Sequence, residues 1–355
     1  MNAYKIWVRA VMASLALFIA VNFAVWGLAT KTLLTPGNEN GDYTRVGYIA
    51  GSSYAIKRDY QLPRKHLENE DYQNQPVDVL TIGDSFSNGC GKRDQYYQDW
   101  IASIDQGNVL NVQKLPGKNS FETVISLLNS GYLDLVHPKV ILIEIIERHA
   151  IDYFSKPFDM NQRLPLDEVV KDFRNLRYLS HPPRVGFLNV GNMKFLLYAF
   201  LYRIKDNAFF SKVYMRELTR PFFSVKNEKQ LIFAYEDFEH LTRENEESIK
   251  RVNENFNRLA QKLEEKGIKL YFMPVVDKYN LYADYLMENP YPRSHFFETL
   301  RALNKKYNLI DTKEILLQEL KRGERDVFYA DDSHWSWKAP KKIFETVRFE
   351  FSRNV

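Results

Sequence analysis

The stretch VDVLTIGDSFSNG, from Val77 to Gly89, contains an apolar run that ends abruptly at Gly83, Asp84 and Ser85. A short apolar run closed by glycine is typical of a strand buried in a parallel sheet. In open α/β sheets, ligands bind outside the carboxyl ends of the strands, where loops present side chains. The stretch therefore predicts a buried strand with Ser85 at an edge suited to chemistry.

Three further apolar runs share this character: Val109 to Gln113, Lys139 to Ile146 (KVILIEII) and Lys269 to Val275 (KLYFMPV). Amphipathic stretches lie between several of the runs. This alternation is typical of βαβ units, so it predicts an α/β fold with a mainly parallel sheet that is buried on both faces.

One of the intervening helices can be checked by spacing. A 3-4-3-4 spacing places five apolar residues on one helical face: Ile249, Val252, Phe256, Leu259 and Leu263. Gly267 then favours a helix end, directly before the run at Lys269. A helix followed at once by a strand is what a βαβ crossover requires.

Composition and charge exclude several classes of protein. The chain has 355 residues and 45% hydrophobic content, which is ample for a packed core. Its 49 basic and 45 acidic residues are spread along the chain, so nucleic acid is not an expected partner. The single cysteine, Cys90, excludes an internal disulfide. No Cys/His cluster has metal-ligand spacing, and we expect neither a metal nor a cofactor.

The N-terminus predicts a membrane anchor. Residues 10–30 carry no charge and are long enough for a helix to cross a hydrocarbon core of about 30 Å. Lys5 and Arg9 precede this run, so the positive-inside rule places residues 1–9 in the cytoplasm and everything after Lys31 across the membrane. A cleaved signal peptide is the alternative, but the run is longer than the usual apolar region of such a peptide.

Beyond the anchor, composition predicts three further parts. Residues 31–75 are rich in Gly, Asn and Ser and indicate a stalk, and residues 76–355 form the folded domain. Residues from about 150 to 241 interrupt the βαβ rhythm and indicate an insertion. Within it, the apolar stretch FLLYAFLYRI (Phe195 to Ile204) could cover the active site, lie on the membrane surface, or pack as a helix.

A second motif, YADDSHWSWKAP, lies near the end of the chain. A serine hydroxyl is a weak nucleophile unless a base activates it, and His334 in this motif is a candidate base. Asp331 and Asp332 precede it by three and two residues, and either carboxylate could orient the imidazole. The alternatives are that Ser85 caps the following helix and that the two aspartates form a solvated turn.

These residues resemble the SGNH (GDSL-like) hydrolase superfamily. The shared features are Gly-Asp-Ser after the first strand, Gly117 in LPGKNS after the second, and a C-terminal Asp-x-x-His. The resemblance implies a three-layer α/β/α sandwich with Ser85 as nucleophile, His334 as base and Asp331 as its orienting acid. It also implies an oxyanion hole formed by the N–H groups of Ser85 and Gly117.

The third block of the superfamily departs from the pattern. Where the family carries an asparagine, this chain reads EIIERHA, and Arg148 could serve as an oxyanion donor or bind substrate. The anchor, the E-x-x-E-R of this block, MPVVDKYNLY and D-S-H-W together resemble the membrane-anchored polysaccharide O-acetyltransferases (AlgX/AlgJ-like). In the alginate proteins the Asp-x-His pair precedes the serine, whereas here it follows. If the motif is read as Asp-x-His, Asp332 is the acid that orients His334.

This second resemblance implies acetyl transfer through an acetyl-serine onto a hydroxyl of a cell-envelope or exported polysaccharide. It implies an enzyme of the bacterial inner membrane with its catalytic domain in the periplasm, and a multi-pass membrane-bound O-acyltransferase as acetyl donor. The alternatives are a carbohydrate esterase or deacetylase with the same triad, and a non-catalytic glycan-binding relative.

Three further residues are candidates for substrate contact. Asp277 and Lys278 follow the fourth strand at the same edge of the sheet, so they could contact substrate or form an ordinary surface pair. Trp335, beside the histidine, could stack on a sugar or pack to hold the loop.

Overall fold

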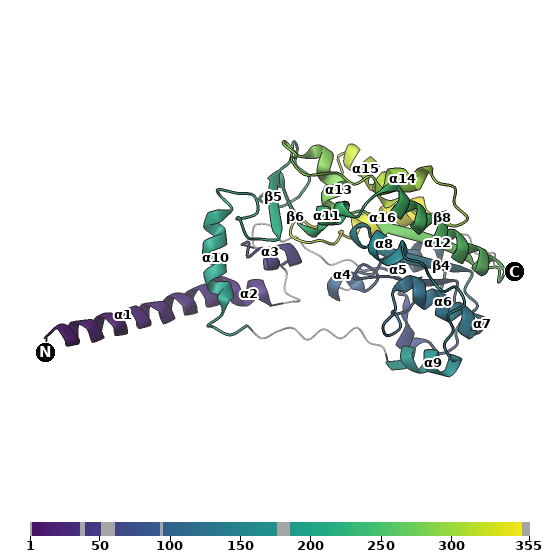
Figure 1. The fold of residues 1–355 in the computed structure, drawn as a ribbon, viewed down its shortest axis with the longest axis horizontal. Helices are drawn as coiled ribbons and strands as arrows, with labels where there is room; N and C mark the ends of the chain where they lie inside the picture. Colours follow the sequence, from purple (N-terminus) through teal and green to yellow (C-terminus); the bar gives the residue numbers. More distant parts are fainter. Residues whose placement is uncertain (1, 36–39, 51–60, 93–94, 176–184, 350–355) are drawn as a thin grey trace. The chain divides into compact units, whose positions relative to one another are not determined.

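The structure, a computed structural model, describes residues 2–35, 40–50, 61–92, 95–175 and 185–349 (Figure 1). The chain forms two compact units. Unit 1 comprises Met1–Lys57, Ser180–Tyr235 and Tyr329–Ser333. Unit 2 comprises Arg58–Leu179, Glu236–Phe328 and His334–Val355.

Unit 2 contains a parallel sheet in the order β1-β3-β2-β4-β7-β8. Its strands are β1 (Leu67–Glu68), β2 (Val79–Ile82), β3 (Val109–Asn111), β4 (Val140–Ile146), β7 (Lys269–Val275) and β8 (Asn308–Leu309). The four predicted apolar runs are the four central strands. The predicted α/β fold with a mainly parallel sheet is confirmed.

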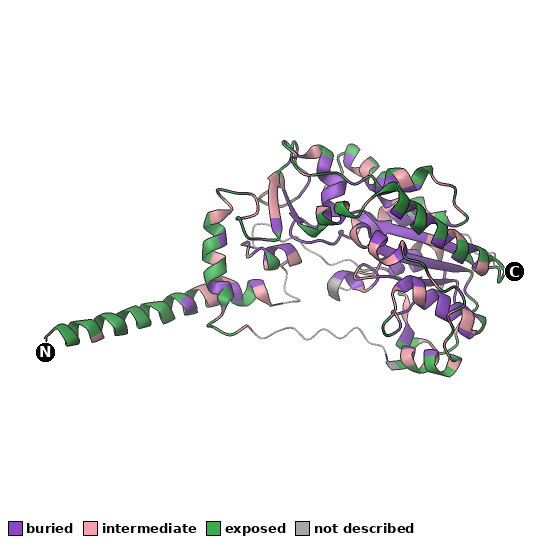
Figure 2. Ribbon diagram, viewed as in Figure 1, coloured by how far each residue is buried: buried purple, intermediate pink, exposed green. Residues whose placement is uncertain are grey.

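Helices flank this sheet. They are α4 (Gly89–Lys92), α5 (Tyr97–Asp105), α6 (Ser120–Ser130), α7 (Leu133–Val136), α8 (Glu147–Phe154), α9 (Leu166–Asn175), α11 (Glu236–Glu239), α12 (Glu246–Glu264), α13 (Lys278–Tyr282), α14 (Phe296–Ala302), α15 (Thr312–Lys321) and α16 (Lys338–Thr346). Short 3₁₀ turns are η3 (Asn69–Asp71), η4 (His240–Thr242) and η5 (Ala283–Tyr285). Every residue of β2 and β4 is buried, as expected for strands covered on both faces (Figure 2).

Helix α12 confirms the spacing argument. Its five predicted core residues are all buried. The helix begins after Asn245, whose side chain accepts the N–H of Ser248 in a capping box. It is followed by Gly267 at φ +72°, in the left-handed region that glycine adopts without strain.

Two predicted segments contribute to the units in ways that composition did not indicate. The segment predicted as a stalk supplies β1, which pairs in parallel with β3 through Leu67 and Leu110. The predicted insertion divides between the units: residues 150–179 and 236–241 belong to unit 2, and Ser180–Tyr235 belong to unit 1.

Unit 1 begins with a long apolar helical segment formed by α1 (Asn2–Val25), the π-helical turn η1 (Trp26–Thr30) and α2 (Lys31–Leu34). Residues Ala3–Leu34 contain an 18-residue window whose mean hydropathy is 2.1, and the segment is long enough to span a membrane. The unit also contains α3 (Asp42–Val46), α10 (Val190–Leu201) and an antiparallel pair, β5 (Val213–Glu217) and β6 (Gln230–Ala234). The N-terminal helix is thus compatible with a single-pass anchor.

Helix α10 packs on the C-terminal part of the apolar N-terminal helix (Figure 1). The Asn192 side chain donates to the Asn22 side chain at 3.1 Å, and the Trp26 indole donates to the Val185 carbonyl at 2.9 Å. Much of the remaining surface of α10 is apolar and exposed: Val190, Met193, Leu196, Leu197 and Phe200. The structure therefore places residues 195–201 of the FLLYAFLYRI stretch on a helix that unit 1 covers only in part.

Candidate active site

The turn after β2 requires a glycine. A Cβ at Gly83 would lie 2.2 Å from both the Glu144 carboxyl and the Ser87 hydroxyl, closer than any side chain tolerates. Asp84 then fixes the turn by accepting two backbone N–H groups at 2.9 Å, one from Phe86 and one from Ile146. The second bond ties the turn to the end of β4. The local sequence thus places Ser85 on a braced turn at the carboxyl edge of the sheet.

Ser85 and His334 come together in unit 2. The imidazole Nε2 lies 2.9 Å from the Ser85 Oγ, although 249 residues separate them in the chain. This is within the range in which a general base takes a proton from a hydroxyl. The Ser85 carbonyl oxygen accepts the N–H of Cys90, so the main chain supports the start of α4 while the hydroxyl faces the imidazole.

The loop that carries His334 is held by its neighbours. Phe328 and Trp335 form an isolated antiparallel bridge, and Ser336 donates its N–H to Val327 at 2.9 Å. Phe86, one residue beyond the serine, contacts the imidazole ring at a centroid distance of 4.8 Å. These contacts restrict the imidazole, as a catalytic base requires.

Trp335 packs against the same phenylalanine. The two rings meet edge to face with their centroids 4.9 Å apart, and Trp335 is 1% exposed. A ring so deeply buried has no free face for a sugar, so the structure favours the packing alternative for Trp335. Its contact with Phe86 helps to hold the histidine loop against the serine turn.

The two candidate acids lie in unit 1, and both are buried. The Asp331 carboxylate accepts the backbone N–H of Gly41 at 2.6 Å. Asp332 is 1% exposed, so the alternative of a solvated turn is wrong for both aspartates. Which carboxylate orients His334 stays a prediction. Gly117 lies in the turn between β3 and α6 at φ +71°, and its role as an oxyanion donor also stays a prediction.

Arg148 lies in α8 between two buried carboxylates. Its Nη1 is 2.5 Å from Asp277 Oδ1 and 3.2 Å from Asp237 Oδ1, and both aspartate side chains are fully buried. Burial raises the pKa of Asp237 and of Asp277, and the Arg148 charge acts in the opposite direction. The positive charge of Arg148 therefore faces the two buried carboxylates of Asp237 and Asp277 and offsets their negative charge.

Lys278 is also fully buried, at the start of α13. Its positive charge lowers the pKa of Asp237, against the larger effect of burial. The alternative of an ordinary surface pair is therefore wrong for Asp277 and Lys278. Together with Arg148 they form a buried charge cluster at the carboxyl ends of β4 and β7.

Sequence reasoning did not single out Glu144, which lies in β4 beneath the serine turn. Its Oε2 accepts the N–H of Asp84 at 3.1 Å and the hydroxyl of Ser87 at 2.7 Å. Burial, together with the neighbouring Asp84 carboxylate, raises the pKa of Glu144 well above its ordinary value. The signal in the sequence was one acidic residue inside the apolar run KVILIEII.

Comparison with known proteins identifies one family. Residues 230–347 match the family model described as an SGNH hydrolase-like domain of the acetyltransferase AlgX. The matched segment includes Asp331, Asp332 and His334. The resemblance to the SGNH superfamily and to its AlgX-like branch, predicted from the motifs, is confirmed. None of the curated proteins and none of the solved structures matches the chain.

Proposed function

We propose that the protein is a serine O-acetyltransferase that moves an acetyl group, through an acetyl-serine, onto a hydroxyl of an envelope or exported polysaccharide. The observation that carries this proposal is the 2.9 Å approach of His334 Nε2 to Ser85 Oγ. The match to an SGNH hydrolase-like acetyltransferase domain supports the transfer chemistry.

The reaction has two balanced steps. In the first, Ser85 Oγ attacks the acetyl carbonyl of the donor while His334 takes the hydroxyl proton, and the departing group receives that proton as its bond to the acetyl carbon breaks. In the second, an acceptor hydroxyl attacks the acetyl-serine and gives its proton to His334, which returns it to Ser85 Oγ. Water in place of the acceptor gives an esterase with the same residues.

The test is turnover of a small acetyl ester by the full chain in detergent, with Ser85→Ala and His334→Ala. Removing either partner of a nucleophile–base pair is expected to lower turnover on the order of 10⁴-fold or more. Ser103→Ala on α5 and His137→Asn on the surface are matched controls and should retain activity. Full activity in both active-site variants would exclude the pair.

Transfer is separated from hydrolysis by the acceptor. With donor alone, peptide mass spectrometry of the wild type should find an acetyl group on Ser85, and added glycan should remove that label and gain an acetyl ester. Release of acetate to water with every glycan tested would favour the esterase alternative.

The proposed location is the bacterial inner membrane, with the catalytic unit in the periplasm. The apolar helix and the basic residues Lys5 and Arg9 before it support this orientation. Helix α10 contacts the N-terminal helix, and its other face is apolar and exposed. That exposed face is suited to lie at the surface of the same membrane. A C-terminal alkaline phosphatase fusion should be active, and an inactive fusion with an active cytoplasmic reporter would reverse the orientation.

A periplasmic acetyltransferase needs acetyl groups carried across the membrane. A multi-pass membrane-bound O-acyltransferase is the proposed donor, with the N-terminal helix and α10 as its contact surfaces. Affinity purification from intact membranes should recover such a protein with the wild type and lose it when the exposed apolar residues of α10 are replaced by serine. Recovery of no acyltransferase with the wild type would remove this part of the proposal.

A further inference from the structure

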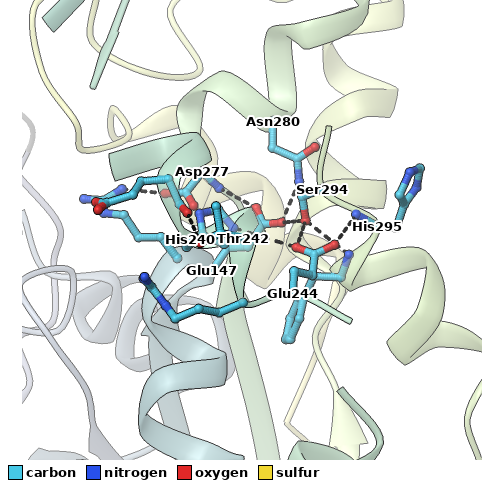
Figure 3. A network of polar contacts seen from close by, with 12 residues as sticks. Glu147, His240, Thr242, Glu244, Asp277, Asn280, Ser294 and His295 are labelled. Atoms are coloured by element: carbon cyan, nitrogen blue, oxygen red, sulfur yellow. Dashed lines mark hydrogen bonds and ion pairs between the residues drawn. The ribbon is translucent and has the colours of Figure 1, made fainter. Parts of the chain in front are cut away.

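A second buried cluster lies beside the charge cluster, and the proposed acetyl transfer does not use it (Figure 3). It contains Glu147 at the start of α8, His240 in η4, and Glu244 in the segment before α12. One oxygen of each carboxylate and one imidazole nitrogen lie within 4.8 Å of one another. All three residues belong to unit 2.

Within this cluster, the Nε2 atom of His240 lacks a hydrogen-bond partner among the described residues. The His240 side chain is 5% exposed. The nearest carboxylate atom, Glu244 Oε2, is 3.8 Å away, beyond hydrogen-bond distance. A buried imidazole nitrogen without a partner is costly, because burial removes its water.

The other ring nitrogen determines what Nε2 can do. His240 Nδ1 lies 3.2 Å from the Glu236 carbonyl oxygen, which can only accept, so Nδ1 carries a hydrogen. In the neutral ring, Nε2 therefore has a free lone pair directed toward the carboxylates. A histidine whose Nδ1–H donates to a carbonyl while Nε2 faces outward has the arrangement found in metal-ligating histidines.

The two carboxylates compete for one hydrogen. Ser294 Oγ lies 2.5 Å from Glu147 Oε1 and 2.7 Å from Glu244 Oε2, and it accepts the N–H of Phe296 at 3.1 Å. A hydroxyl has a single hydrogen, so it can donate to only one of these two acceptors. One of these two contacts is therefore left without a hydrogen, and a cation between the three side chains would bind the carboxylate oxygens there.

The backbone and neighbouring side chains hold both carboxylates in place. Glu147 accepts the Asp277 N–H at 2.9 Å and the Asn280 amide at 2.6 Å. Glu244 accepts the His295 N–H at 2.6 Å through its other oxygen. Such outer bonds orient the ligands of protein metal sites.

We propose that Glu147, His240 and Glu244 bind one divalent transition-metal ion, with Zn²⁺ as the ion that best fits the ligand set. One imidazole nitrogen and two carboxylate oxygens suit zinc, whereas Mg²⁺ and Ca²⁺ prefer oxygen ligands alone. Side-chain shifts of less than about 1 Å bring the three atoms to zinc-bonding distance. One of the three proposed ligands, Glu244, also lines a cavity of about 640 Å³ together with His295 and Glu298.

The site would brace the end of β4. Glu147 directly follows Ile146, whose N–H binds the Asp84 carboxylate of the serine turn, and it directly precedes Arg148. An ion at Glu147 would therefore join α8 to η4 and to the segment before α12. Its role is structural, so its test does not depend on acetyl transfer.

The experiment uses the full chain in detergent, stripped with a chelator and titrated with Zn²⁺. Calorimetry and elemental analysis should give one zinc per chain, and a hundredfold excess over Kd should raise Tm by roughly 5–10 °C. His240→Gln and Glu244→Gln should each weaken zinc binding at least tenfold. His295→Gln and Glu246→Gln, which alter exposed side chains beside the same cavity, should bind as the wild type does.

A second measurement covers variants that fold poorly. Co²⁺ added to the stripped wild type should give visible absorption bands of a low-coordinate site with nitrogen and oxygen ligands, and Zn²⁺ should displace them. Absence of stoichiometric zinc in the wild type, or zinc binding that His240→Gln leaves unchanged, would overturn the proposal.

Discussion

Replacing Arg148 by methionine should strongly destabilise unit 2. Arg148 is 13% exposed and faces Asp237 and Asp277, whose side chains are fully buried. Methionine retains much of the apolar stem but leaves both carboxylates without their cation. Breaking a buried ion pair by removing one partner costs about 3–5 kcal/mol. For a unit of this size, that corresponds to a fall in Tm on the order of 10 °C.

The pH dependence of this fall has a defined sign. Burial raises the pKa of both aspartates in the folded protein. A carboxyl with a raised pKa contributes its full stability below its ordinary pKa and loses it as pH rises through the folded value. Losing Arg148 raises both values further, so the Tm deficit of Arg148→Met should be largest at neutral pH and shrink as pH falls toward about 4.

Thermal unfolding followed by circular dichroism at several pH values measures both effects. Arg251→Met is the matched control, because Arg251 is 58% exposed and pairs with Glu247 on the surface of α12, where such pairs contribute at most about 0.5 kcal/mol. Adding Asp277→Asn to Arg148→Met should restore part of the lost stability. An Arg148→Met deficit no larger than the control, or one that grows as pH falls, would refute this reasoning. Lost turnover with unchanged Tm would instead support Arg148 as an oxyanion donor.

Substitutions at two further positions test the serine turn and unit 1. Glu144→Gln should retain the bonds to Asp84 and Ser87 and raise Tm above pH 7, because the raised pKa of Glu144 costs stability as pH rises. Glu144→Ala should instead cost about 1–3 kcal/mol, because it leaves the Asp84 N–H without its acceptor, whereas Ser87 keeps its bond to the Tyr97 hydroxyl. An unfolding series in which both variants behave alike would contradict this role. Gly41→Ala places a Cβ 1.8 Å from the Asp331 carbonyl oxygen, so the variant should be digested faster by proteases than the wild type. Gly186→Ala is the control, because the atom nearest to its Cβ is 3.9 Å away, and it should be digested like the wild type. Equal digestion of the two variants would argue against the packing of Gly41 on Asp331.

The sequence by itself determined the central strands and the main helix. Each of the four central strands is a short, almost wholly apolar run, and α12 has an apolar face at helical spacing, so local pattern was sufficient. It also located Ser85 and His334, because a strand end and a histidine beside acidic residues are visible as motifs. These inferences depend on residues within a few positions of one another.

Only the tertiary structure decided which charges meet. Arg148 pairs with Asp237 and Asp277, 89 and 129 residues away, and His240 lies close to Glu147 of a distant helix. It also decided that Glu144 lies beneath the serine turn and that the predicted stalk supplies an edge strand. Spacing along the chain carries no information about such pairs. Their proximity follows from strand order and from how helices pack, and their protonation follows from the burial that packing creates.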